Sequence, residues 1–186
     1  MKVAVYCSAK NQIPEDYLCL GDTIGKWLAV NGHSLVYGGA TGGLMTRVSE
    51  AFKQAKDPAL TEQKLIGVVP EQIIRNGRKS DLCDELHVVA YMSERKQRMR
   101  ELADCFVCLP GSYGTLDEMM DVIASGTVNE HHKPCIILNH NGFYNPLLQL
   151  IDCMKQLRFI PEQESYRPLF VGTTEELYQT INTLIK

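Results

Sequence analysis

Short apolar runs rich in β-branched residues alternate along the chain with longer segments of helical periodicity. The runs predict strands at Lys2–Cys7, Ser34–Tyr37, Leu65–Val69, Glu85–Val89, Cys105–Leu109, Pro134–Leu138 and Leu169–Val171. The intervening segments predict helices over Glu15–Asn31, Gly43–Lys56, Ser93–Ala103, Leu116–Val128, Asn145–Leu157 and Thr174–Lys186. Strands that are apolar throughout are typical of a parallel sheet covered on both faces. The alternation therefore predicts an α/β fold, a doubly wound parallel sheet with right-handed crossovers.

Length and composition predict a single domain with the character of a soluble globular protein. No linker, repeat or low-complexity segment divides residues 1–186, and 45% apolar with 22% charged residues is close to the average for globular proteins. The net charge of −3 predicts no binding of nucleic acid or of an anionic membrane, so any phosphate contacts must come from a few placed groups. The chain begins directly with a strand, without the features of a signal peptide, which predicts a cytoplasmic protein.

The seven cysteines are an odd number, and most lie in apolar segments, which predicts buried, reduced thiols. Cys105 and Cys108 have the spacing of a redox or zinc motif. They lie in a predicted strand, however, where an offset of three places the two sulfurs on opposite faces. No second pair completes a zinc site, so neither a metal nor a redox centre is predicted.

A glycine-rich loop follows the second predicted strand. Residues 38–43 read Gly-Gly-Ala-Thr-Gly-Gly and lead into a helix. Glycines allow positive φ and close approach of a ligand, and free N–H groups at a helix start attract an anion such as phosphate. The spacing matches neither G-x-G-x-x-G nor a Walker A motif, which disfavours dinucleotides and triphosphates. Two interpretations stay open: a phosphate-binding loop, or a turn that only lets helix and strand pack closely.

A second loop of the same kind follows the fifth predicted strand, and carboxylates follow the loop. Residues 110–115 read Pro-Gly-Ser-Tyr-Gly-Thr, and two anion-receptive helix starts at the carboxyl ends of strands favour one phosphate ligand. Thr115 and Glu118 have the spacing of a capping box, which favours a structural role for both. The alternative is that Glu118 lies beside the sugar of the ligand, where a carboxylate stabilises an oxocarbenium-like state or activates water.

Four cationic residues lie near the start of the predicted helix Ser93–Ala103: Arg95, Lys96, Arg98 and Arg100. Positive charge there opposes the helix macrodipole, which indicates an anionic ligand nearby. Glu94 and Arg98 are four residues apart and predict an ordinary surface ion pair. Taken singly, each cation is predicted to be solvated.

Two separated motifs resemble the signature of a known family. Met92-x-x-Arg95-Lys96, followed by Pro110-Gly111-x-Tyr113-Gly114-Thr115-x-x-Glu118, is similar to the paired motifs of the Lonely Guy family. These proteins are cytokinin riboside 5'-monophosphate phosphoribohydrolases, formerly catalogued as possible lysine decarboxylases. The similarity extends over most of the chain, with further matching segments at Val36–Gly39, Gly43–Met45, Ile66–Pro70, Lys133–Pro134 and Asn139–Tyr144.

The resemblance implies a Rossmann-like fold, a homodimer, and no metal or organic cofactor. It implies hydrolysis of the N-glycosidic bond of a nucleoside 5'-monophosphate, of the AMP or cytokinin riboside type, to free base and ribose 5-phosphate. The family's catalytic residues correspond to Arg95 and Glu118. The substrate- and phosphate-binding positions that the match implies are Ser8, Gly38, Gly39, Gly42, Gly43, Met92, Lys96, Gly111, Ser112, Tyr113, Gly114 and Thr115.

The chain departs from the family pattern in both loops near the expected phosphate. The usual Pro-Gly-Gly is Pro110-Gly111-Ser112 here. If this position requires positive φ, Ser112 suffers a penalty of about 1 kcal/mol; if not, its hydroxyl can contact phosphate. The first loop reads Cys7-Ser8-Ala9 where the family more often has Cys-Gly-Ser-Ser. These departures bear on substrate preference more than on reaction class.

A second class of function is a non-catalytic protein that binds a phosphate-bearing ligand, such as a carrier of the molybdenum cofactor. It predicts stoichiometric binding without release of a base, and the presence of both Arg95 and Glu118 argues against it. The older decarboxylase label requires a lysine for a Schiff base and a pyridoxal phosphate site, and nothing in the sequence singles one out.

Overall fold

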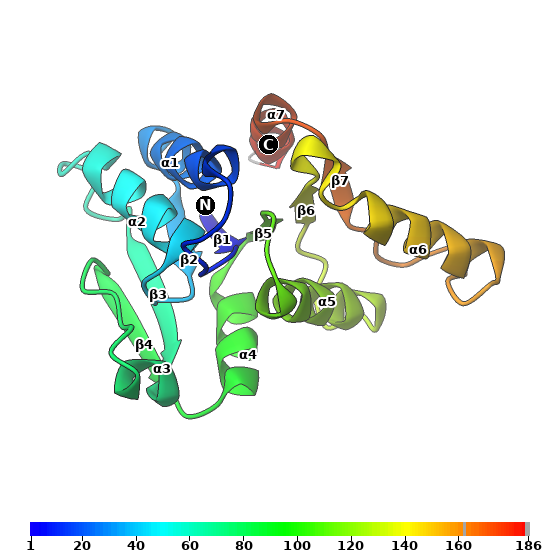
Figure 1. Cartoon of the computed structure of the whole chain (residues 1–186), viewed down its shortest axis with the longest axis horizontal. Helices are drawn as coiled ribbons and strands as arrows, with labels where there is room; N and C mark the ends of the chain where they lie inside the picture. Colours follow the sequence, from blue (N-terminus) through cyan, green and yellow to red (C-terminus); the bar gives the residue numbers. More distant parts are fainter. Residues whose placement is uncertain (162, 185–186) are drawn as a thin grey trace.

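A seven-stranded parallel sheet forms the centre of the computed structural model, which describes residues 1–161 and 163–184. The strands are β1 (Lys2–Tyr6), β2 (Ser34–Tyr37), β3 (Leu65–Pro70), β4 (Glu85–Val89), β5 (Cys105–Cys108), β6 (Cys135–Leu138) and β7 (Leu169–Val171). Their order is β4-β3-β2-β1-β5-β6-β7, and every pairing is parallel (Figure 1). The chain therefore winds outward from β1 to β4, returns to β5 beside β1, and winds the other way to β7.

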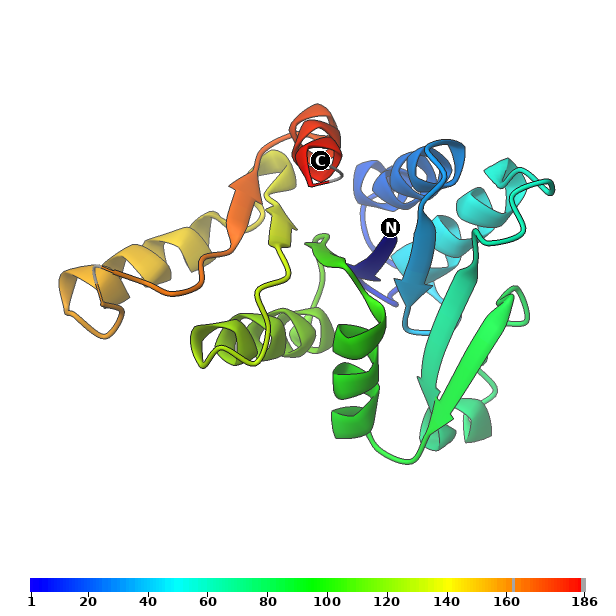
Figure 2. The ribbon, with the colours of Figure 1, turned by 180° about the vertical axis from the view of Figure 1, so that it is seen from behind.

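Helices cover both faces of the sheet. They are α1 (Glu15–Val30), α2 (Gly43–Ala55), α3 (Glu71–Arg75), α4 (Met92–Leu102), α5 (Tyr113–Thr127), α6 (Asn145–Gln156), α7 (Thr174–Thr183) and the short 3-10 helix η1 (His140–Gly142). Both views place α1, α2 and α7 on one side of the sheet and α4 and α5 on the other (Figures 1 and 2). The core is accordingly divided into two apolar clusters, one on each face.

The doubly wound α/β fold predicted from the sequence is confirmed. Each predicted strand is present, with ends that differ by no more than one residue. The main errors concern helices: α5 begins at Tyr113 instead of Leu116, and the short α3 and η1 were not predicted. The last two residues of the predicted C-terminal helix, 185 and 186, lie outside the described residues.

Apolar content explains why the strand predictions held. All residues of β2, β3, β5 and β6 are buried, as continuous apolar runs require, whereas β4 at the edge is only partly buried. Cys105 and Cys108 lie in β5 and belong to the clusters on opposite faces, which confirms their predicted separation. No helix among residues 1–161 and 163–184 has the length and apolar character needed to cross a membrane.

Glycine decides how closely α1 and α2 approach each other. A Cβ atom built on Gly25 would lie 2.3 Å from the backbone oxygen of Val48. The two helices therefore touch through their backbones at this point, and any larger residue at position 25 would force them apart.

Candidate active site

A cavity of about 210 Å³ opens at the carboxyl ends of β1, β2 and β5. Ligands bind open parallel sheets at the point where strand order reverses, and here the order reverses between the paired strands β1 and β5. The cavity is lined by Cys7, Ser8, Ala9, Gly38, Ala40, Met45, Ile73, Arg78, Met92, Arg95, Ser112, Gly114, Thr115 and Glu118.

A buried ion pair forms one wall of the cavity. Arg95 Nη1 donates to Glu118 Oε1, and the two residues are only 5% and 3% exposed. Arg95 Nε also donates to the backbone oxygen of Val68 at 3.1 Å, which fixes the guanidinium in orientation. Gly38 makes room for it, because a Cβ at this position would lie 2.3 Å from Arg95 Nη2. The sheet and both flanking helices thus hold this arginine in place.

The electrostatic balance at Glu118 is set by burial and by Arg95. Burial raises the pKa of the Glu118 carboxyl, and the adjacent Arg95 guanidinium opposes part of that rise. A buried carboxyl with a raised pKa and a specific charge partner in a cavity is typical of acid–base sites. The pair is therefore the group in this cavity best suited to act on a ligand.

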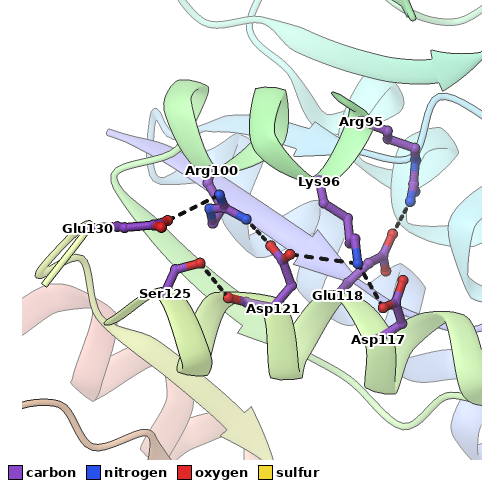
Figure 3. A network of polar contacts seen from close by, with 8 residues as sticks. All are labelled: Arg95, Lys96, Arg100, Asp117, Glu118, Asp121, Ser125 and Glu130. Carbon is purple, nitrogen blue, oxygen red and sulfur yellow. Dashed lines mark hydrogen bonds and ion pairs between the residues drawn. The ribbon is translucent and has the colours of Figure 1, made fainter. Parts of the chain in front are cut away.

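A ladder of ion pairs joins α4 to α5 beside this pair (Figure 3). Lys96 Nζ donates to Asp117 Oδ1 at 2.7 Å and lies 3.6 Å from Asp121 Oδ1. Arg100 pairs with Asp121 and reaches Glu130 at 3.5 Å. Both cations are less than one-fifth exposed, so the ladder fixes α4 relative to α5 and with them the two residues of the buried pair.

The prediction that the cations of α4 are solvated is therefore wrong for three of the four. Arg98 is the most exposed of the four, with 42% of its side chain accessible, and it pairs with Glu101 at 3.1 Å instead of the predicted Glu94. The Glu94 carboxylate accepts a hydrogen bond from the backbone N–H of Ala90 at 3.0 Å. Spacing within one helix could not reveal that the partners of the other cations lie on a second helix.

The start of α5 presents free hydrogen-bond donors to the cavity. Ser112 is the N-cap residue and its side chain makes no capping bond. The N–H groups of Tyr113, Gly114 and Thr115 have no acceptor within the part of the chain that the structure describes. Since Thr115 lies inside the helix and Glu118 contacts Arg95, the predicted capping box is wrong. These donors remain available to an anion.

Ser112 stands where the family has a second glycine, and its backbone conformation shows whether serine is strained at this position. Its φ is −101°, an ordinary extended value, so the serine suffers no left-handed penalty. Its side chain borders the cavity, and contact between the hydroxyl and a ligand stays a prediction.

The glycine loop at the start of α2 is bonded differently. The N–H of Gly42 donates to Thr46 Oγ1 and that of Gly43 to Asn11 Oδ1, both at 2.7 Å. Cβ atoms on these glycines would lie 2.5 and 2.4 Å from the backbone oxygens of residues 9 and 10. The geometry favours the interpretation in which these glycines permit close packing, since their donors are already bound.

The structure brings most of the predicted site residues together. Eight of them line the cavity: Ser8, Gly38, Met92, Arg95, Ser112, Gly114, Thr115 and Glu118. Gly42 and Gly43 border an adjacent hollow instead. Four others are outside both linings: Gly39, Lys96, Gly111 and Tyr113. Of these, Gly111 still shapes the site, because a Cβ there would meet Thr115 Oγ1 at 2.1 Å.

Six lining residues were not predicted: Cys7, Ala9, Ala40, Met45, Ile73 and Arg78. Four of them lie within two positions of a predicted site residue: Cys7 and Ala9 flank Ser8, Ala40 follows Gly39, and Met45 follows Gly43 by two positions. Ile73 and Arg78 come from α3 and the loop after it, which carried no recognisable pattern. No sequence signal identifies Arg78, because its place in the cavity depends on the contact between its loop and the glycine loop after β2.

Fold and cavity together define a Rossmann-like α/β protein with a buried arginine–glutamate pair beside an anion-receptive helix start. A family model described as possible lysine decarboxylase matches residues 45–181. Cytokinin riboside 5'-monophosphate phosphoribohydrolase LOG of Oryza sativa subsp. japonica is 35% identical over 176 residues, covering 95% of this chain and 70% of that protein. LOG5 of Arabidopsis thaliana, which carries the same functional name, is 35% identical over 182 residues, covering 97% and 76%. The chain belongs to this family, the Lonely Guy (LOG) family.

Solved structures share the fold at lower identity. The molybdenum cofactor binding protein from Rippkaea orientalis has a TM-score of 0.71 at 21% identity, with 100% of this chain and 97% of that chain covered. The molybdenum cofactor carrier protein from Chlamydomonas reinhardtii has a TM-score of 0.69 at 18% identity, covering 99% and 97%. These likenesses show the fold.

Proposed function

We propose that this protein hydrolyses the N-glycosidic bond of a nucleoside 5'-monophosphate to free base and ribose 5-phosphate, acting in the cytoplasm as a homodimer. The observation that carries the proposal is the buried Arg95–Glu118 pair, which lies in one cavity with the free donors of the α5 start. Family membership supports it, because the relatives in rice and Arabidopsis are named phosphoribohydrolases of cytokinin riboside 5'-monophosphates.

The phosphate belongs at the start of α5. Three unbound N–H groups and the positive end of the helix macrodipole meet there, whereas the donors of Gly42 and Gly43 are already bound. Glu118 follows Thr115 by three residues and so lies one helical turn further along the same face. A phosphate held at the helix start therefore leaves the attached sugar near Glu118.

Glu118 then serves the reaction as a carboxylate. Cleavage of a glycosidic bond develops positive charge on the sugar, which a nearby carboxylate stabilises while it positions water. Arg95 favours the ionised form of Glu118 against the effect of burial, and its bond to Val68 keeps the carboxylate in one orientation. Binding energy from the phosphate supplies the orientation of the anomeric carbon.

A panel of nucleoside 5'-monophosphates tests the proposal. The panel includes AMP and isopentenyladenosine monophosphate beside the matching nucleosides, and chromatography measures the free base. We expect base from monophosphates only, and a fall in kcat of about 10²–10⁴-fold for Glu118→Gln with binding of ribose 5-phosphate retained. Glu101→Gln, on the outer face of α4, is the matched control. Near-normal turnover by Glu118→Gln would refute the assignment.

The same panel separates hydrolysis from mere binding. A non-catalytic carrier of a phosphate-bearing ligand would show a thermal shift with one monophosphate and no release of base from any. The shared fold does not distinguish the two functions, so the outcome of the panel decides between them.

The proposed homodimer is supported by an apolar hollow whose lining shares no residue with that of the candidate active site. A hollow of about 450 Å³ lies between α5, α6 and the segment before β7, and its lining includes Met120, Ile123 and Phe159. Phe159 is 78% exposed, a high value for a phenylalanine, and large exposed apolar patches mark interaction sites. Light scattering should give a dimer for the native protein and a monomer for Phe159→Asp. A native monomer would contradict this part of the proposal.

A further inference from the structure

Arg78 lines the cavity from a loop that the family motifs do not include. The loop follows α3 and is hydrogen-bonded to the glycine loop after β2. Thr41 N–H donates to Arg78 O at 2.8 Å, and Ser80 N–H donates to Gly39 O at 2.9 Å. The Arg78 side chain is hydrogen-bonded to the same loop, because its Nη2 donates to Thr41 O at 2.7 Å. The loop thus places a guanidinium between the cavity and the adjacent hollow, both of which it lines.

The charge of Arg78 is not balanced by a carboxylate. Within residues 1–161 and 163–184 its guanidinium makes no ion pair, unlike Arg95, whose charge Glu118 cancels. These three are the charged residues of the cavity lining, so its net charge is +1 and comes from Arg78. An anion entering the cavity therefore meets a positive charge that no carboxylate among the described residues neutralises.

We infer that Arg78 binds the 5'-phosphate of the substrate together with the α5 start, and that it selects phosphorylated substrates over nucleosides. This inference rests on the proposed function. A phosphate monoester carries a charge of about −1.5 to −2 near neutral pH. A helix start supplies only about +0.5, and the Arg95–Glu118 pair supplies none, so the helix alone leaves most of the phosphate charge unmatched. With Arg78 the positive charge rises to about +1.5, close to that of the ligand.

The Arg78 guanidinium is held in position and keeps donors for a phosphate. One N–H of Nη2 is bound to Thr41, which holds the group in place, and an arginine has five N–H donors in all. The remaining donors can form a charge-assisted, two-pronged contact with phosphate oxygens, which a lysine cannot reproduce. Arg78→Lys should therefore keep the charge but lose part of the affinity.

The test compares Arg78→Ala and Arg78→Lys with Arg75→Ala. Arg75 lies three residues away on α3, is largely solvated and pairs with Glu71, so it is the matched control. Calorimetry measures the binding of ribose 5-phosphate and of ribose, and steady-state kinetics measures kcat and KM with AMP. Melting temperatures verify that each variant is folded.

For Arg78→Ala we expect ribose 5-phosphate affinity to fall and KM for AMP to rise by about 10- to 100-fold, with a fall in kcat that is smaller than the rise in KM. Arg78→Lys should fall between Arg78→Ala and the native protein, and Arg75→Ala should match the native protein. Native-like affinity in folded Arg78→Ala would overturn the inference while leaving hydrolysis standing. Native protein that binds ribose 5-phosphate through Arg78 but releases no base would overturn the proposed reaction and leave Arg78 as a phosphate ligand. Failure of the native protein to bind ribose 5-phosphate would overturn the inference itself.

Discussion

Gly38 offers a way to displace Arg95 without altering either member of the ion pair. The backbone at Gly38 does not have positive φ, so Gly38→Ala imposes no conformational strain. The new methyl group would lie 2.3 Å from Arg95 Nη2, whereas an ordinary contact begins near 3.4 Å. Arg95 must therefore shift by the difference, 3.4 − 2.3, or about 1.1 Å, although Val68 and Glu118 hold it.

A shift of this size is large enough to measure in two ways. Misplacement of a reacting group by about 1 Å can lower the rate roughly 10²-fold, equivalent to about 2.7 kcal/mol of activation free energy. Overpacking a well-filled site costs about 1–3 kcal/mol of the free energy of unfolding. At this chain length each kcal/mol lowers the melting temperature by about 2–4 °C.

The assay measures kcat with a nucleoside 5'-monophosphate and the melting temperature of the same preparations. Gly172→Ala is the control, because its methyl group would meet Glu176 Oε2 at an ordinary 3.6 Å and its φ is not positive. We expect Gly38→Ala to lose both rate and stability and Gly172→Ala to lose neither. A folded Gly38→Ala enzyme with kcat within threefold of native would refute the claim that the position of Arg95 matters for turnover.

Two further predictions concern stability. Asp84 is subject to burial, which acts to raise its pKa, but hydrogen bonds from Lys53, the Leu65 N–H and Lys56 prevail and lower the pKa from 3.8 to about 2. Its folded pKa is depressed, so it stabilises the folded protein above pH 4, and this contribution is lost as pH falls towards 2. Because Asp84 is an exposed residue, solvent screening limits the contribution to about 1 kcal/mol. Urea unfolding should show Asp84→Asn less stable than the native protein at pH 7, with the difference closing over that pH range. Ser112→Gly should lower the free energy of unfolding by about 0.5 kcal/mol. The φ angle at this position is ordinary, so glycine relieves no strain in the folded protein and only raises the conformational entropy of the unfolded chain. A gain in stability in thermal melts would contradict this reasoning.

The sheet was predictable because burial on both faces leaves a continuous apolar signal. Runs such as Leu65–Val69 and Cys105–Leu109 have no other simple interpretation at that length, and their order with the helices fixed the fold class. The start of α5 was misplaced by three residues because Gly-Ser-Tyr-Gly is typical of a loop. In the structure the helix begins at Tyr113, inside that motif.

The site was predictable only as far as its motifs reach. Arg95 and Glu118 could be named from a resemblance, but their burial depends on α4 and α5 lying side by side, which is a tertiary fact. The same holds for Lys96 and Arg100, whose partners are on the other helix. Arg78 had no motif at all, and only the pairing of its loop with the glycine loop places it in the cavity.

The reversal of strand order divides the cavity between two consecutive stretches of chain. Ser8, Gly38 and Arg78 come from the stretch that ends with β4, whereas the buried ion pair and the α5 start come from the stretch that begins with α4. A cut in the exposed connection at residues 90–91 would yield one fragment holding the acid–base pair and another holding the unpaired arginine. Because β1 and β5 must pair before the cavity exists, neither fragment could form it alone, and activity would return only when the two reassemble.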